Sequence, residues 1–389
     1  WPKMGILKYI AEGEQQTKAD VKYVPVSVVY DLIPDVKTMT REGRGLDKSP
    51  ESLMWFVNYL RKMGGKFGKI SLRFGEPVHM DDTSSAELPL IQETSPSDKY
   101  KLPRFAFNLV HQINQITPVT TTSLICITLL SKFAATKLTI ERDVIELMEI
   151  IESRSTDALI DRGTSINESV QRALNLLIKA DLIRQTGKEH KAKYAIVAEN
   201  YLPATYYANM AVHHLYHRAF IEIALIKVSG LRAPNRYAAF WKEIMELRDM
   251  FKFEFFYSQK AEFSDEIEHD LSLLNKDWRA KLSGRKNDVL GLLKSRDLLL
   301  SQVVLFPYIE AYRVVGKAMM DYDVHEDLTD AQLLNECLFL GEEMHWQGQI
   351  QRLDSVSKPF LTNGIRLVKN LDLVPNVHDN KEVAIRGFI

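Results

Sequence analysis

The chain has 389 residues, of which 46% are hydrophobic and 26% charged, and its formal net charge is -1 at pH 7. This length is sufficient for two or three domains with hydrophobic cores, and the near-neutral charge gives no electrostatic reason to expect a nucleic-acid partner. No uninterrupted run of about 18 apolar residues occurs, so a membrane-spanning helix is not expected. The two cysteines, Cys126 and Cys337, lie in apolar stretches, which predicts buried thiols in a reducing, cytoplasmic compartment.

Helix and strand patterns alternate over residues 1–80. The segment MGILKYIAEGEQ is typical of the end of a helix, and VKYVPVSVVYD, residues 21–31, has the two-residue period of a strand. A helix follows in SPESLMWFVNYLRKMGG, with Ser49 as its N-cap and Gly64 and Gly65 at its end. GKISLRFGEPV then has the pattern of a second strand. Strand, helix and strand in this order predict part of a mixed α/β sheet with flanking helices.

The first of these strands contains a proline, which a buried strand rarely tolerates. Val24, Val26 and Val28 share one face of the strand, and Pro25 lies on the other. Because proline has no N–H group to donate, it is usually confined to edge strands, strand starts or bulges. One interpretation of Pro25 is therefore an edge position with a purely structural role.

The remainder of the chain is predicted to be mainly α-helical. Residues 81–104 are polar and are predicted to form a linker. Over residues 105–200, stretches with apolar residues at three- and four-residue spacing precede a polar turn and a strand, an order typical of a winged helix. Acidic and basic residues are nearly equal in number there, so the basic face that DNA binding requires is missing. Residues 201–389 are predicted to be long amphipathic helices.

The common motifs of cofactor and metal chemistry are absent from the sequence. It has no glycine-rich phosphate loop, no Cys-x-x-Cys pair and no His-Glu-x-x-His. In VHHLYH, His213 and His217 are four residues apart on one helical face, but no third ligand accompanies them, so a packed helix is favoured over a metal site. His325 and Asp330 form a His-x-x-x-x-Asp pair in an acidic stretch, which we interpret as a chance match. Neither a metal nor a cofactor is predicted.

Seven short segments follow one another in a characteristic order: PKMGIL, YVPVSVVYD, SPESL, GKISLRFGEPV, NQITPVTTTSLICITLL, TYYANMAVHH and MFKFEFFYSQKAEFSDEIEHDL. This succession resembles the membrane-associated bacterial glycerol-3-phosphate acyltransferases and the related dihydroxyacetone-phosphate acyltransferases. YVPVSVVYD is similar to a segment of the wider acyltransferase superfamily. FGEPV and TYY-x-N-x-x-x-H, the latter from Thr205 to His213, are similar to the glycerol-phosphate branch alone.

The resemblance implies four sequence blocks, of which only the fourth, the valine–proline strand, occurs here. The others, with the catalytic His-x-x-x-x-Asp pair and phosphate-binding arginines, are expected before residue 1. The chain thus resembles the C-terminal part of such an enzyme and is expected to be inactive alone. Because the fourth block borders the substrate cleft in the family, Val24, Pro25, Val26 and Tyr30 are candidate substrate-binding residues. Packing at the strand end is the alternative role of Tyr30. Lys3 is a further candidate, for a phosphate contact, with solvated surface as its alternative.

The implied activity is transfer of a fatty acyl group from acyl-CoA or acyl carrier protein to the 1-hydroxyl of glycerol 3-phosphate, in phospholipid biosynthesis. The first-block histidine would act as general base, with its tautomer held by the aspartate. Because the product partitions into a bilayer, peripheral attachment to the cytoplasmic side of the cell membrane is expected. Two alternatives are a dihydroxyacetone-phosphate acyltransferase and a non-catalytic helical module, after residue 105, that docks on a membrane or a protein partner.

Overall fold

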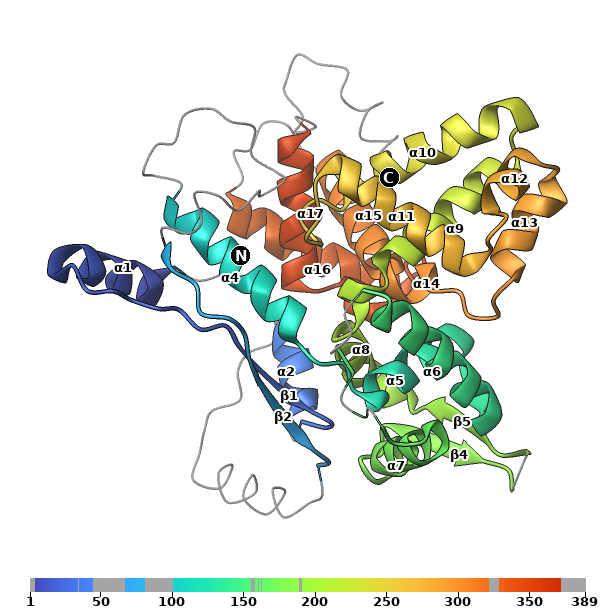
Figure 1. Ribbon diagram of the computed structural model, residues 1–389, viewed down its shortest axis with the longest axis horizontal. Coiled ribbons are helices and arrows are strands. Elements are labelled where there is room, and N and C mark those ends of the chain that lie inside the picture. The colour runs from blue at the N-terminus through green and yellow to red at the C-terminus, as the bar shows by residue number, and fades with distance from the viewer. Residues whose placement is uncertain are drawn as a thin grey trace.

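The computed structural model describes residues 4–33, 35–44, 67–80, 101–154, 158–159, 161, 163–188, 191–321 and 329–371. Helices make up most of this part of the chain, and two small antiparallel sheets, of two and three strands, accompany them (Figure 1). This architecture confirms the predicted fold class, a small α/β portion followed by a mainly helical region. The helix predicted in SPESLMWFVNYLRKMGG lies outside the described residues. None of the described helices has the length and apolar character needed to cross a bilayer.

The N-terminal portion projects from one side of the helical body (Figure 1). Its strands pair antiparallel, with Val26 opposite Phe74 and Tyr30 opposite Ile70. It contains α1 (Gly5–Thr17), β1 (Val26–Tyr30), α2 (Val36–Gly43) and β2 (Ile70–Phe74).

Pro25 lies just before β1, where the ladder between the two strands is interrupted. An isolated bridge pairs Tyr23 with Val78, whereas the regular ladder begins with Val26 opposite Phe74. Between these two pairs, residues 24–25 of the first segment face residues 75–77 of the second. One strand thus has one extra residue, which is the arrangement of a β-bulge. The Pro25 carbonyl accepts a hydrogen bond from the Gly75 amide at 2.8 Å. At a strand start beside a bulge, the missing N–H of proline removes no ladder bond.

A second unit is built around α5, whose residues from Thr121 to Leu130 are all buried. In this unit β5 lies between β3 and β4, and both pairings are antiparallel. Helix, strand, two helices and two strands in this order are typical of a winged helix. Its elements are α5 (Thr121–Lys132), β3 (Ala134–Thr136), α6 (Lys137–Glu152), α7 (Ile166–Lys179), β4 (Ile183–Thr186) and β5 (Lys193–Ile196). The helix before them, α4 (Lys101–Ile116), packs against β1.

The C-terminal half is helical throughout its described part. Its centre is α9, which is mostly buried and packs against α10, α11, α13 and α14. The elements are η4 (Ala198–Asn200), α8 (Tyr201–Asn209), η5 (Val212–His214), α9 (Tyr216–Ser229), α10 (Ala233–Met250), α11 (Lys260–Leu274), α12 (Trp278–Ser283), α13 (Lys286–Lys294), α14 (Ser301–Val304), α15 (Phe306–Asp321), α16 (Asp330–Trp346), η6 (Leu353–Ser355) and α17 (Lys358–Asn370).

A separate small cluster, formed by Ala11, Met80 and Phe105, packs α1 against α4, and one larger hydrophobic core joins most of the other elements. It runs from Val36 of α2 through α5 and α9 to Tyr312 of α15, and a smaller cluster lies among α15, α16 and α17. Cys126 belongs to the larger core and Cys337 to the cluster among α15, α16 and α17, and both are free and buried, which confirms the prediction of buried thiols.

Candidate functional site

The structure separates the predicted substrate-binding residues into two groups. Val24, Val26 and Tyr30 point to the outer face of β1, with exposed fractions of 37–45%. Pro25 points the other way and is buried, and its ring lies so close to Gly75 that a Cβ there would meet Pro25 Cβ at 3.2 Å. Lys3 lies outside the described residues. The three outward-facing residues therefore share one surface, and Pro25 contributes to the opposite side of the strand.

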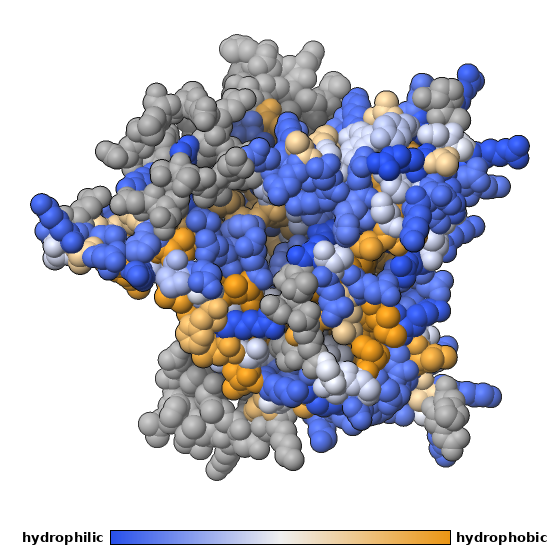
Figure 2. All heavy atoms as spheres, viewed as in Figure 1, coloured by the Kyte–Doolittle hydropathy of each residue, from blue (hydrophilic) through white to orange (hydrophobic). Residues whose placement is uncertain are grey.

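The outer surface is apolar across both strands. Three cross-strand pairs lie on it: Val26 with Phe74, Val28 with Leu72, and Tyr30 with Ile70. Figure 2 shows hydrophobic side chains gathered over this projecting sheet. A two-stranded sheet is marginally stable by itself, and exposed apolar patches usually mark interaction sites. We call this surface the sheet face; it consists of Val24, Val26, Val28, Tyr30, Ile70, Leu72 and Phe74, all at least 37% exposed.

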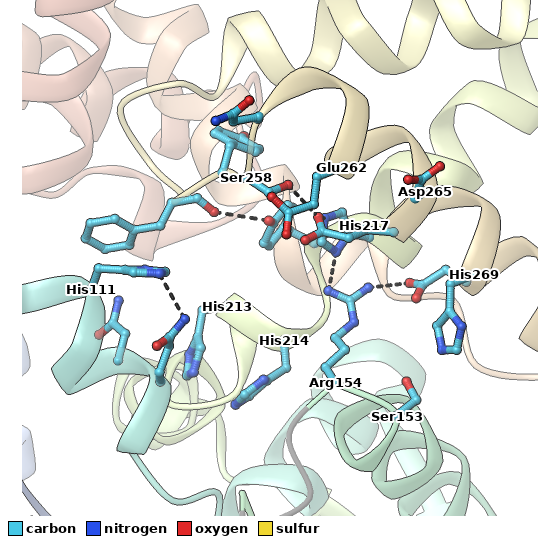
Figure 3. A pocket seen from close by; sticks show the side chains of 18 of the residues that line it. His111, Ser153, Arg154, His213, His214, His217, Ser258, Glu262, Asp265 and His269 are labelled. Carbon is cyan, nitrogen blue, oxygen red and sulfur yellow. Dashed lines mark hydrogen bonds and ion pairs between the residues drawn. The ribbon is translucent and has the colours of Figure 1, made fainter. Parts of the chain in front are cut away.

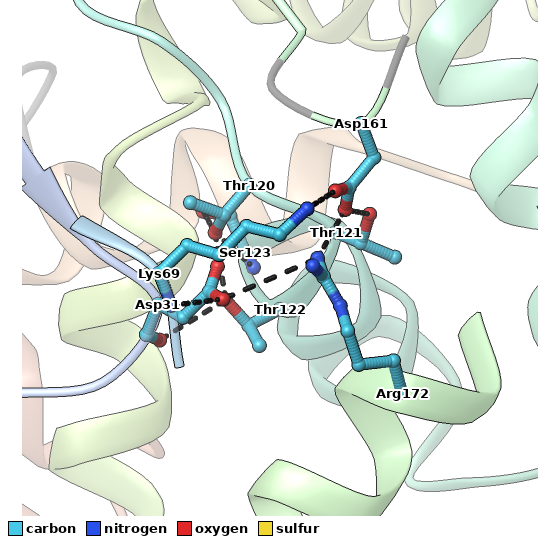
Figure 4. Close-up of polar contacts among 8 residues, drawn as sticks. All are labelled: Asp31, Lys69, Thr120, Thr121, Thr122, Ser123, Asp161 and Arg172. Atoms are coloured by element: carbon cyan, nitrogen blue, oxygen red, sulfur yellow. Dashed lines mark hydrogen bonds and ion pairs between the residues drawn. The ribbon is translucent and has the colours of Figure 1, made fainter. Parts of the chain in front are cut away.

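A polar cluster at the end of the two strands fixes the sheet to the helical body (Figure 4). Asp31 follows β1, and its Oδ2 accepts a hydrogen bond from the Lys69 amide at 2.9 Å. The Asp31 backbone carbonyl accepts a second bond from the Thr122 hydroxyl at 3.2 Å. Burial raises the pKa of the Asp31 carboxyl, although the Lys69 amide and the Arg172 guanidinium oppose this effect.

Asp161 forms the second half of this cluster. Its carboxylate accepts hydrogen bonds from Lys69 Nζ at 3.2 Å, from the Thr121 hydroxyl at 2.9 Å and from the Arg172 guanidinium. Two cations thus face the carboxylates of Asp31 and Asp161, and the charges balance. The arrangement joins the strand pair to α5 and α7, and we interpret it as structural, because none of its groups is left available for proton transfer.

A cavity of about 930 Å³ lies where α4, the end of α6, η5, α9 and α11 meet (Figure 3). This volume falls within the range of sites that bind small molecules. Figure 3 shows that α4 contributes His111, the segment after α6 contributes Arg154, and α11 contributes Glu262, Asp265 and His269. The cavity therefore collects polar side chains from four stretches that are far apart in sequence, 107–115, 153–154, 213–217 and 256–270.

Histidines supply a large part of the cavity wall: His111, His213, His214, His217 and His269. Burial lowers the pKa of His213 to about 4 and that of His214 to about 2. It also lowers the pKa of His111 and, more strongly, that of His217. Because burial disfavours the charged form, these four rings are neutral at pH 7, and each offers one donor and one acceptor nitrogen.

Their hydrogen bonds indicate which nitrogen carries the proton. The His213 ring donates to the backbone carbonyl of Asn114, and its Nε2 has no partner among the described residues, so Nε2 is a free acceptor. The Nε2 atom of His214 is likewise unpartnered within the described ranges, and this side chain is only 5% exposed. The Nδ1 atom of His217 contacts the Arg154 guanidinium, which can only donate, so the proton of this ring is on Nε2.

A chain of polar contacts crosses the cavity floor. Arg154 donates to the Asp270 carboxylate and to His217, whose Nε2 lies 3.0 Å from a Glu266 oxygen. Ser258 donates to the same Glu266 oxygen at 3.0 Å. Burial raises the pKa of Glu266, against the opposing effect of its Ser258 bond. This chain fixes the relative positions of α9 and α11, so the cavity wall is held in place.

The sequence patterns identified only part of this site. His213 and His217 were singled out, but a break at Leu215 places them in different helices, η5 and α9. The α11 residues that line the cavity are three or four positions apart and so share one face of the helix: 262, 265, 266, 269 and 270. This spacing can be seen in the sequence EFSDEIEHD, residues 262–270. Among the described residues, no group of three or more His, Cys, Asp or Glu is placed to hold a metal ion.

The chain matches a family described as "Glycerol-3-phosphate acyltransferase C-terminal region" over residues 39–376. Relatives from Mycobacterium tuberculosis and Mycobacterium bovis, provisionally named acyltransferase plsB1, are 28% identical over 394 residues, which cover 99% of this chain. A "Glycerol-3-phosphate acyltransferase" from Pseudoalteromonas atlantica is 24% identical over 246 residues, covering 60% of this chain and 30% of that protein. The chain spans 62% of the length of the mycobacterial relatives. Because the family match extends over most of its residues, the chain belongs to the glycerol-3-phosphate acyltransferase C-terminal region family.

Proposed function

We propose that this chain is the C-terminal portion of an enzyme that transfers a fatty acyl group to the 1-hydroxyl of glycerol 3-phosphate. Acyl-CoA or acyl carrier protein is the proposed donor. Family membership over residues 39–376 supports acyl transfer of the glycerol-3-phosphate type. The observation that carries the finer proposal is the sheet face, because it lies on the strand that resembles the fourth block of these enzymes and is exposed.

The proposed occupant of the sheet face is the part of the enzyme that carries the His-Asp pair. Each of the seven side chains is about half exposed, so covering it would contribute roughly 1 kcal/mol. The sum, several kcal/mol, is comparable to the net stability of a whole domain. A surface of this kind favours a permanent contact between parts of one enzyme, which would place Val24, Val26 and Tyr30 beside the reacting groups.

In the proposed reaction, the histidine supplied by that other part removes the proton of the 1-hydroxyl. The hydroxyl oxygen then forms an ester bond with the thioester carbonyl carbon, the carbon–sulfur bond breaks, and the departing thiolate takes the proton from the histidine. Val24, Val26 and Tyr30 would form an apolar wall that excludes water from the thioester. Since the lysophosphatidic acid product partitions into a bilayer, we further propose peripheral attachment at the cytoplasmic side of the cell membrane.

A chimera tests this proposal. In it, the 389-residue chain replaces the matched region of the Mycobacterium tuberculosis relative, and acyl transfer to glycerol 3-phosphate and to dihydroxyacetone phosphate is measured. We expect no turnover from the chain alone, turnover from the chimera with glycerol 3-phosphate, and loss of turnover on Leu72→Asp. The matched control is Leu138→Asp, which changes an apolar side chain that is 76% exposed and lies outside the sheet face.

Three results would contradict the proposal. Turnover by the chain alone would show that catalysis needs no further part. Faster acylation of dihydroxyacetone phosphate than of glycerol 3-phosphate would favour the alternative acceptor. Full activity of the Leu72→Asp chimera would show that the sheet face has no role in assembling the enzyme.

A further inference from the structure

The cavity between α4, α9 and α11 has an unusual electrostatic character. Four carboxylates of α11 line it: Glu262, Asp265, Glu266 and Asp270. Among the described lining residues the one permanent cation is Arg154, and it is paired with Asp270. Burial raises the pKa of Glu266, and the positive charges of Arg154 and of Arg248, which does not line the cavity, oppose this shift. Glu262 and Asp265 have no cationic partner among the described residues.

Like-charge repulsion acts along one face of α11, although the helix N-terminus favours its first-turn acid, Glu262. Glu262, Glu266 and Asp270 succeed one another at four-residue spacing, and like charges at this spacing destabilise a helix. The remaining acidic residue of this helix, Glu268, is partly buried, does not line the cavity and pairs with Arg279. On the cavity side of α11, Glu262 and Asp265 are therefore the carboxylates that have no cationic partner among the described residues.

The buried histidines that line the cavity add hydrogen-bond acceptors and no positive charge. The unpartnered Nε2 of His213 is an acceptor, and that of His214, a side chain only 5% exposed, also lacks a partner within the described ranges. Because burial keeps these rings neutral at pH 7, an anion such as a phosphate would meet carboxylates and only one, already paired, guanidinium. The chemistry of the wall therefore selects against anions and favours groups that donate N–H bonds.

An apolar strip borders the same cavity. The Phe107 and Phe256 rings contact each other with centroids 4.6 Å apart, and the His111 ring lies 5.1 Å from Phe256. Aromatic faces attract ammonium groups and also pack against methylene chains. We propose that the cavity binds a linear polyamine, with ammonium groups at Glu262, Asp265 and Glu266 and with its methylene chain against Phe107 and Phe256. The Cβ atoms of residues on adjacent helical turns are about 5–6 Å apart, so the carboxylates that they carry can reach amines separated by three or four methylene groups.

Spermidine is the probe that tests this site. We expect isothermal titration of the 389-residue protein at pH 7.5 and low salt to give saturable binding at a single site, weakened by added salt. Glu262→Gln should weaken spermidine binding about tenfold, because it removes one charge-assisted bond, and adding Asp265→Asn should weaken it further. Both side chains are exposed, so these variants are expected to fold like the parent.

Glu268→Gln is the matched control, since it removes the same charge from the same helix outside the cavity, and it should leave spermidine affinity within about twofold of the parent value. Thermal unfolding of each variant checks that α11 is intact. Absence of saturable spermidine binding to the parent protein would overturn the proposal. So would equal weakening by Glu262→Gln and Glu268→Gln, or displacement of spermidine by inorganic phosphate or glycerol 3-phosphate. None of these outcomes depends on whether the chain takes part in acyl transfer.

Discussion

Replacement of Glu254 by glutamine is expected to remove a loss of stability that develops as the pH rises. Glu254 follows α10 and joins it to the last helices: its carboxylate accepts a hydrogen bond from the Tyr312 hydroxyl at 2.6 Å and one from Asn363 Nδ2 at 3.0 Å. Burial raises the pKa of Glu254 from 4.5 to about 7, although both hydrogen bonds oppose the shift. The neutral acid is therefore the form that the folded protein prefers.

The sign and size of the effect follow from linkage. Below pH 4.5 the carboxyl is protonated in both states, so its full contribution to stability is present. Between 4.5 and about 7 the unfolded chain loses this proton while the folded protein keeps it, so stability falls as the pH rises. A shift of about 2.5 units at 1.36 kcal/mol per unit gives a total loss of about 3 kcal/mol, of which 2–3 kcal/mol falls between pH 5 and pH 8.

Urea unfolding of the parent protein and of Glu254→Gln at pH 5, 6, 7 and 8 measures this loss. Glutamine has the shape of glutamate and does not ionise. The unfolding free energy of Glu254→Gln minus that of the parent protein should therefore increase by about 2–3 kcal/mol between pH 5 and pH 8. The buried histidines, including His213 and His214, act in the opposite direction below pH 6.5 but do so in both proteins and cancel in the difference. Asp249→Asn, which changes a carboxylate on α10 that is 66% exposed, is the control. An identical pH dependence in the parent and Glu254→Gln would refute the reasoning.

Two further outcomes are expected from buried groups. Glu222→Ala removes the acceptor of the Leu300 and Ser301 amides, each 2.8 Å from the carboxylate, and takes this partner from the buried Arg218 guanidinium. It should therefore lower the free energy of unfolding by about 3–5 kcal/mol. A loss below about 1 kcal/mol in urea unfolding, no larger than that of an exposed helical glutamate changed to alanine, would contradict this. Burial raises the pKa of Cys126 and Cys337 to about 12. A disulfide reagent should therefore react with neither thiol in the folded protein and with both in denaturant. Rapid reaction of either thiol before unfolding would contradict this prediction.

The strand that carries Pro25 illustrates what a sequence pattern can predict. Alternation of apolar residues correctly placed Val24, Val26 and Val28 on one face, because the side-chain period of a strand is local. It also suggested a structural reason for the proline, and the structure supplies the detail, a bulge opposite Gly75. Which face points inward was decided by packing: the valine face is the exposed one.

The cavity could not have been derived in the same way. Its walls come from α4, α9 and α11, and the neutrality of His213 and His214 results from burial that these helices create together. The spacing of the acidic residues in the α11 sequence does predict that they share one face of the helix, because residues three and four positions apart are neighbours on a helix surface. No pattern within α11 indicated that this face looks into a cavity or that Arg154 would neutralise only Asp270.

The sequence by itself indicated the family, the strands β1 and β2, the mainly helical remainder and the burial of both cysteines, because each of these depends on local order and composition. It did not predict the short elements α2 and β3. Tertiary structure alone decided that the valine-rich face of β1 is exposed and that four distant stretches of the chain enclose a cavity lined by neutral histidines and by carboxylates. The reason is physical: the charge state and accessibility of a side chain depend on the dielectric and the neighbours that long-range packing supplies.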